Sequence, residues 1–322
     1  MVEIQEGLAT AARNRLAEIV VGFRETGFAV IDGGQFEDFP SLLRRDGLFG
    51  RSLFLDHANI EIERAGPWLV ALAQAQDAAE RVLGLVGDVP AAVFWSCTGG
   101  EAVLYRHLRT INQARIPAWS AAGEAPPPET GSGETYETVM FRHWDPRVLG
   151  PLMPALDARQ FARVLGPAQE IAFRADEYGG LKRIPVDLSW PEAALGMLTI
   201  RSEQMRALSE RRIEARRRSV SAYLRDLADG ALDGTSEADL RAHVLASEAR
   251  ARTLGIVTEA GHCRWAFLMM ITRGRIGEDP AVSSYIRNGV RSPDDHLEDI
   301  MDATSRSVRG SSGAGPAVGG RP

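Results

Sequence analysis

The sequence predicts an α/β lobe, with a mixed sheet and flanking helices, followed by an all-α lobe. In the first 195 residues, short β-type runs alternate with stretches whose apolar residues recur at helical spacing. From residue 196 onward the pattern is helical throughout. A chain of 322 residues is long enough for two lobes of this kind.

The first lobe, residues 1–195, should contain six short strands and several helices. An opening amphipathic helix is expected to end near Gly27, and Pro67 stands at the start of a second helix that runs to Leu83. A third helix should follow Gly100, and a fourth helical region covers 149–165. Apolar runs predict strands at 28–31, 53–55, 91–97, 138–141, 171–174 and 181–186.

One segment of this lobe has the composition of a mobile insert. Residues 120–134 read SAAGEAPPPETGSGE, with three consecutive prolines among Gly, Ser and Glu. Such a segment cannot bury enough apolar surface to order itself. Since β-type runs of the same lobe stand on both sides, we expect a loop within the first lobe and not a domain boundary.

The second lobe, residues 196–308, carries recognisable helix caps. Ser202, Ser236 and Thr258 each precede a helical pattern, and Gly255 follows one. Two further helices are expected to begin at prolines 280 and 293. The Gly-rich residues 309–322 should form a disordered tail.

The most informative segment is Thr138 to Leu156, which joins a β-type run directly to a helix start. Asp145 stands at the N-cap and Pro146 at the first helical position, where proline loses nothing by lacking an N–H. Arg142 and Arg147 bracket the turn within reach of Asp145. The sequence therefore predicts a strand-to-helix corner that is held by ion pairs and is structural in purpose.

Four landmarks in the first lobe, taken in order, resemble the type VI secretion effector-chaperone (adaptor) family. They are GFAVID at 27–32, AGPWLV at 65–70, FWS at 94–96 with the helix carrying HLR at 107–109, and the corner at 142–147 with its later Gly166-Pro167. His143 and the turn at 97–100 depart from the family pattern. The resemblance implies a cytoplasmic protein that is not an enzyme. It would bind a toxin effector and help load it onto the spike protein of the secretion system.

Composition and charge are those of an ordinary soluble globular protein. The net charge of −6 argues against whole-surface attraction to nucleic acid or to an anionic membrane. Cys97 and Cys263 lie far apart without metal-ligand spacing, which suggests two free thiols in a reducing compartment. The N-terminus lacks the features of a signal peptide, and no apolar run is long enough to span a membrane. No metal, cofactor, nucleic acid or membrane is therefore expected.

Two alternatives to the chaperone remain open. His143 beside Asp145 could belong to a hydrolase, although the chain has no GxSxG elbow to supply a nucleophile. The basic run at 211–218 could belong to a nucleic-acid-binding regulator. In a chaperone, the same run would contact an acidic partner surface. The candidate partner-binding residues are Trp119 and Trp190, which flank loops, and Arg211, Arg212, Arg216, Arg217 and Arg218.

Overall fold

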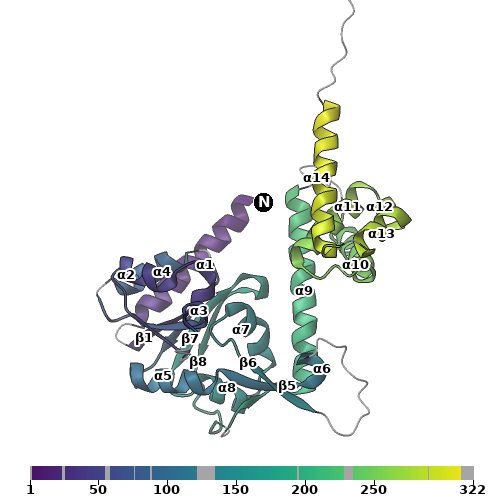
Figure 1. Cartoon of the computed structure of the whole chain (residues 1–322). Coiled ribbons are helices and arrows are strands. Elements are labelled where there is room, and N and C mark those ends of the chain that lie inside the picture. Colours follow the sequence, from purple (N-terminus) through teal and green to yellow (C-terminus); the bar gives the residue numbers. More distant parts are fainter. Residues whose placement is uncertain are drawn as a thin grey trace, which may run out of the picture. The chain divides into compact units, whose positions relative to one another are not determined.

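The computed structural model describes residues 2–23, 26–54, 59–75, 77–87, 89–121, 135–193, 196–227, 235–288 and 290–312. The chain forms two compact units, Met1–Arg212 and Ile213–Pro322. The first combines sheets with helices and the second is helical (Figure 1). The predicted fold class, an α/β lobe followed by an all-α lobe, is confirmed.

The first unit is organised around a six-stranded sheet. Its strands are β1 (Gly27–Asp32), β2 (Gly50–Ser52), β3 (Pro67–Ala71), β4 (Ala92–Ser96), β7 (Glu170–Ala175) and β8 (Gly180–Pro185). They lie in the order β2-β3-β1-β4-β7-β8, and each neighbouring pair is antiparallel. This sheet therefore differs from the predicted mixed sheet.

The mixture of strand directions occurs in a second, three-stranded sheet. It consists of β5 (Gln113–Pro117), β6 (Tyr136–Met140) and β9 (Leu198–Thr199). The central strand β5 pairs antiparallel with β6 and parallel with β9. Ala114 and Leu198 of this sheet join the same core as one face of the large sheet. The small sheet therefore adds to the covering of that face.

Side chains of the large sheet alternate between two cores, one on each face. In β1, Phe28 and Val30 join one core, while Ala29 and Ile31 join the other. The Ile31 face is covered by α1 (Val2–Gly22), α2 (Phe39–Arg45) and α4 (Ala78–Val86). The Val30 face is covered by α5 (Glu101–Thr110), α7 (Pro146–Leu152) and α8 (Ala158–Leu165) (Figure 1). Short connecting elements are η2 (Gly33–Gln35), α3 (Ile60–Ala65), α6 (Ala118–Ala121), η3 (Met153–Ala155) and η4 (Asp176–Tyr178).

The helix predicted from Pro67 to Leu83 is wrong in its first half. Pro67–Ala71 is strand β3, and helix begins only at Ala78. β3 lies between β1 and β2, so its backbone groups are paired on both sides. Pro67 is tolerated because it is the first residue of the strand. The strand expected at 53–55 is likewise shifted to β2, and β5 was not predicted.

The second unit contains six helices in the described part of the chain, the first of which begins in the first unit. They are α9 (Ser202–Leu227), α10 (Glu237–Leu254), α11 (Glu259–Ile271), α12 (Arg275–Glu278), α13 (Pro280–Asn288) and α14 (Pro293–Ser312). Ser236 and Thr258 cap α10 and α11 as predicted, each accepting a backbone N–H three residues on. Gly255 ends α10 in the left-handed conformation with φ of 76°.

The units divide between Arg212 and Ile213, later than the expected boundary at 195. The reason is that Met205 and Leu208, in the first turns of α9, belong to the core of the first unit. Residues 120 and 121 of the predicted insert end α6, and 122–134 lie outside the described residues. Helix α14 continues to Ser312 instead of ending at 308, and the rest of the predicted tail is not described.

Candidate functional site

The corner after β6 is built as the sequence predicts at its helix start. Asp145 has extended backbone angles, and its Oδ1 accepts the backbone N–H of Arg147 at 2.8 Å. Pro146 follows at the first position of α7. Asp145 is therefore an N-cap, which satisfies one of the N–H groups left open at a helix start.

The ion pairs of this corner differ in part from the prediction. Arg142 pairs with Asp145 at 3.1 Å, as expected, and also reaches Asp32 at 2.8 Å. Arg147 contributes its backbone N–H to Asp145, but its side chain turns to Glu177 at 3.8 Å. The ion pairs of the corner therefore connect Asp145, through Arg142, to Asp32 at the end of β1. Asp32 closes an apolar run in the sequence, and that position was the only local signal for its role.

Two of the family landmarks also meet at the end of β1. Asp32 is opposite Pro67 in the β1–β3 register, and Gly33 donates its N–H to the carbonyl of Gly66 at 2.9 Å. A Cβ on Gly33 would lie 2.2 Å from the carbonyl oxygen of Arg64. The close crossing therefore requires glycine at position 33. The end of the opening strand β1 therefore contacts both the AGPWLV segment and the corner.

The third landmark is held by burial. Trp95 of β4 is completely buried, and its ring lies 6.3 Å from that of His143. His107 of α5 contacts the carbonyl oxygen of Val164 through Nε2 at 2.9 Å. A Cβ added to Gly166 would lie 2.2 Å from the nearest atom of the His107 ring. Gly166, with φ of +54°, therefore serves both the turn and the packing of His107.

His143, the central residue of the hydrolase alternative, is completely buried. Its Nε2 donates to Oδ1 of Asn112 at 2.9 Å. Burial, with a smaller contribution from His107, lowers the pKa of His143 to about 3. The imidazole is therefore neutral near pH 7. Asp145 is occupied separately by Arg142 and the helix N-terminus, while Ser96 shares a hydrogen bond with Thr26.

The two tryptophans proposed for partner contact make internal contacts. Trp119 of α6 is half-buried and donates its indole N–H to Oγ of Ser202 at 3.1 Å. Trp190 is half-buried and stacks on Phe161 with ring centroids 5.1 Å apart. Both pack against the core of the first unit. Each leaves only part of its surface for another molecule.

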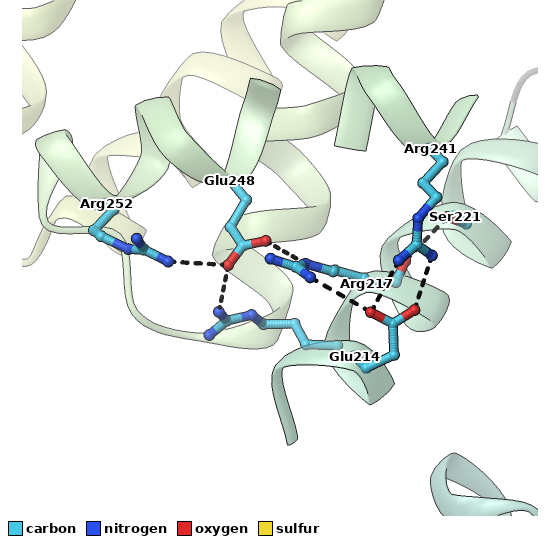
Figure 2. A network of polar contacts seen from close by, with 7 residues as sticks. Glu214, Arg217, Ser221, Arg241, Glu248 and Arg252 are labelled. Carbon is cyan, nitrogen blue, oxygen red and sulfur yellow. Dashed lines mark hydrogen bonds and ion pairs between the residues drawn. The ribbon is translucent and has the colours of Figure 1, made fainter. Parts of the chain in front are cut away.

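The arginine run on α9 is largely engaged within the second unit. Figure 2 shows Glu248 of α10 facing the arginines of α9. Glu248 receives Arg217 at 2.6 Å, Arg252 at 3.2 Å and Arg216 at 3.4 Å. Burial by itself would raise the pKa of Glu248, but the hydrogen bond from Arg217 and the three positive charges lower it. Glu248 is therefore a buried, ionised centre that ties α9 to α10.

A second carboxylate extends this network. Glu214 accepts Arg241 of α10 at 2.9 Å and Arg217 at 3.4 Å (Figure 2). The hydrogen bond from Arg241 lowers the pKa of Glu214 most. Arg217 therefore bridges Glu214 and Glu248. Two local spacings in the sequence belong to this network, Glu214–Arg217 at i, i+3 and Glu248–Arg252 at i, i+4. The remaining partners are distant in the sequence.

The other predicted partner-binding arginines differ from one another. Arg218 is exposed and has an interaction of its own, while Arg211 is half-buried and Arg212 exposed. The run is therefore not a uniform solvated patch. Arg216 and Arg217 belong to the helix–helix contact, which is a correction to the expectation that all five arginines face a partner.

A groove of about 960 Å³ lies between α1 and the β7–β8 hairpin. Ile19 and Leu181 form apolar parts of its wall, and Glu18 and Arg183 form charged parts. Arg183 is paired with Glu170 of β7. The groove therefore combines apolar surface with charges, a combination typical of protein contacts as well as of small-molecule sites.

Several expectations concern metal, membrane and thiol chemistry. Within the described ranges, no group of three or more His, Cys, Asp or Glu residues could hold a metal ion. No helix in the same ranges is long and apolar enough to cross a membrane. Cys97 and Cys263 are both buried and unpaired, and burial raises the pKa of Cys263 to about 11. Cys263 is therefore protonated at neutral pH.

Comparison with protein families finds one match, over residues 27–163, to the family described as Domain of unknown function (DUF4123). No curated protein and no solved structure matches the chain. The matched range begins at the first residue of β1 and ends within α8, and it contains the landmarks from GFAVID to the corner. Residues 27–163 of this chain therefore form a DUF4123 domain.

Proposed function

We propose that the protein is a chaperone, or adaptor, for a type VI secretion system. It binds a toxin effector in the cytoplasm and helps load that effector onto the spike protein. The observation that carries the proposal is the ordered set of four landmarks in residues 27–167, which resembles the effector-chaperone family. Binding would be stoichiometric and would cover surface of the effector until loading.

The contacts of the landmark residues support a role in binding more than one in chemistry. The polar residues of the corner bind one another: Arg142 joins Asp32 to Asp145, and Asp145 caps α7. A charged group used in this way fixes the geometry of the chain and is not offered to a substrate. The landmarks therefore define a rigid frame, and partner contact falls to surfaces around it.

The hydrolase and the nucleic-acid regulator receive less support. A general base must lie within reach of a substrate proton and have a pKa near the working pH. His143 has no exposure to solvent, donates to Asn112, and has a pKa of about 3. In a nucleic-acid-binding regulator, Arg216 and Arg217 would have to break their ion pairs with Glu248 in order to neutralise phosphates.

The test is co-expression of the full chain with the toxin encoded beside its gene, followed by affinity purification and size-exclusion chromatography. We expect the toxin to be recovered soluble, and in a stoichiometric complex, only when the chain is present. The variant Arg147→Gln serves as a matched control, because its ion pair is long and exposed and its loss should leave recovery unchanged. Failure to recover the toxin with the wild-type chain, together with tight and salt-sensitive binding of nucleic acid, would overturn the proposal.

A further inference from the structure

Tyr105 of α5 is covered by two arginines that come from different parts of the first unit. The guanidinium carbon of Arg51, on edge strand β2, lies 3.6 Å from the centre of the Tyr105 ring. That of Arg109, one turn along α5, lies 5.7 Å from the same centre. The hydroxyl of Tyr105 donates to the carbonyl of Ser52 at 3.0 Å. The hydroxyl end of the ring is therefore fixed, and the ring holds the guanidinium groups by cation–π attraction.

Both arginines keep their hydrogen-bonding capacity. Each is exposed, and neither guanidinium makes a hydrogen bond or ion pair within the described residues. Glu248 shows the opposite arrangement, where three arginines converge on one carboxylate. At Tyr105 two like charges share one ring, and no carboxylate from the described part of the chain pairs with either of them. Two like charges held at one ring repel each other, and an added carboxylate would relieve the repulsion.

The stacking also prepares these side chains for recognition. A guanidinium carries five N–H donors in a planar fork that matches a carboxylate. When its face rests on an aromatic ring, the donors point away from the ring edge toward solvent, and less conformational freedom is lost on binding. Arg51 is stacked closely enough for this. Arg51, Arg109 and Tyr105, which together form the arginine receptor, are therefore suited to binding a carboxylate.

An exposed apolar residue stands beside the receptor. Phe49 is 80% exposed and precedes Arg51 by two residues. Its backbone is held by the side chain of Gln74, which accepts the Phe49 N–H at 2.7 Å and donates to its carbonyl at 3.1 Å. Phe49 is thus presented by a fixed backbone. Exposed aromatic residues next to arginine are typical of the central contacts of protein interfaces.

We propose that Arg51 and Arg109, stacked on Tyr105, bind the carboxylates of an acidic segment of a partner protein, with Phe49 contacting an apolar residue of that segment. The inference deepens the proposed function, because the natural partner would be the effector. A protein is favoured over nucleic acid because Phe49 adds an apolar contact and the chain as a whole carries a net charge of −6.

The experiment measures binding of a fluorescein-labelled peptide of glutamates with one central phenylalanine to the full chain by fluorescence anisotropy. The double variant Arg51→Gln/Arg109→Gln should weaken binding by about tenfold or more, since two charge-assisted contacts are lost. The control Arg159→Gln/Arg287→Gln removes two exposed arginines from α8 and α13 and should bind like wild type. Arg51→Lys/Arg109→Lys keeps the charge but loses the fork, and should fall between the two. Circular dichroism checks that each variant is folded.

Equal binding by wild type and the Arg51/Arg109 glutamine variant would overturn the inference. So would equal losses in that variant and the control, since they would indicate only a general charge effect. A labelled oligo-dT that binds more tightly than the peptide, and loses affinity in the same variant, would replace the protein partner by nucleic acid. Recovery of the toxin with the double variant as with wild type would refute the receptor and leave the chaperone standing. Peptide binding without any toxin recovery would support the receptor and refute the chaperone.

Discussion

Nη2 of Arg142 lies 2.8 Å from Oδ2 of Asp32, a residue 110 positions earlier in the chain. Asp32 is buried at the end of β1, where it also accepts the backbone N–H of Gly34. Arg142 binds Asp145 with the same nitrogen. One guanidinium therefore connects the first strand of the DUF4123 domain to the start of α7, and closes a long loop of chain.

Replacing Arg142 by glutamine should destabilise the first unit by about 2 kcal/mol. The substitution leaves the buried Asp32 carboxylate without its cation, which is costly, although the partial exposure of Arg142 reduces the cost. Urea unfolding followed by tryptophan fluorescence measures the change, because five of the six tryptophans lie in the first unit. Arg147→Gln is the control and should cost about 0.5 kcal/mol or less. Equal effects of the two substitutions would show that the pairing of Arg142 with buried Asp32 does not stabilise the first unit.

Gly33→Ala should destabilise the same unit by more than about 2 kcal/mol, because the new methyl group would overlap two backbone carbonyls. The Cβ would lie 2.2 Å from the oxygen of Arg64 and 2.8 Å from that of Gly66, and neither can move without shifting the chain. Gly84→Ala is the matched control, since nothing lies within 4 Å of its Cβ in helix α4. It should stabilise the protein by about 0.5–1 kcal/mol. The two melting temperatures should therefore move in opposite directions.

Sequence patterns predicted those elements whose signals are local. The N-caps at Asp145, Ser236 and Thr258, and the C-cap at Gly255, depend on one side chain or one glycine and the backbone within a few residues. Strands β4 and β7 were predicted because both of their faces are buried, which gives a continuous apolar run. In each case the deciding contact lies within the segment or follows from its overall hydrophobicity.

Elements that depend on distant partners could not be predicted in the same way. Pro67 begins a strand because β1 and β2 flank it, and without them a proline before an alanine-rich stretch resembles a helix start. The side chain of Arg147 pairs with Glu177 and not with Asp145, which is nearer in the sequence. Arg51 contacts Tyr105, which lies 54 residues later in the chain. No spacing rule relates such pairs. Arg216 and Arg217 pair with Glu248 in the same way, since that residue lies on another helix.

Glu248→Gln should destabilise the second unit by about 2–3 kcal/mol, because three arginines lose a buried common partner. Hydrogen exchange of α10 peptides, measured by mass spectrometry, follows this unit separately. Glu298→Gln is the control, since Glu298 is exposed and its pair with Arg264 is 3.5 Å long, and exchange should barely change.

The same network gives an acid dependence. The pKa of Glu248 is lowered from its ordinary 4.5, so its contribution to the stability of the second unit is complete above pH 4.5 and is lost as the pH falls below that value.

Replacing Arg216 and Arg217 by glutamine should reproduce much of the Glu248→Gln effect. Unchanged α10 exchange in both variants would show that the network does not hold α9 to α10.

His143 gives the first unit a second, distinct dependence on pH. In the unfolded chain it takes up a proton as the pH falls below about 6.5, whereas burial keeps it neutral in the folded protein down to about 3. The unfolded state thus binds more protons in this interval, and stability falls with decreasing pH by up to about 1.4 kcal/mol per unit.

The variant His143→Gln removes this dependence and isolates it from the other buried histidines. Near pH 7.5 the variant should be less stable than wild type, because a fully buried, well-packed ring is lost. Since only the wild type loses the His143 contribution on acidification, the difference should narrow by about 2 kcal/mol between pH 7.5 and pH 5. Urea unfolding at several pH values measures it. A difference that stays constant over that range would mean that His143 takes up a proton in the folded protein as readily as in the unfolded chain, and that its contact with Asn112 must be reconsidered.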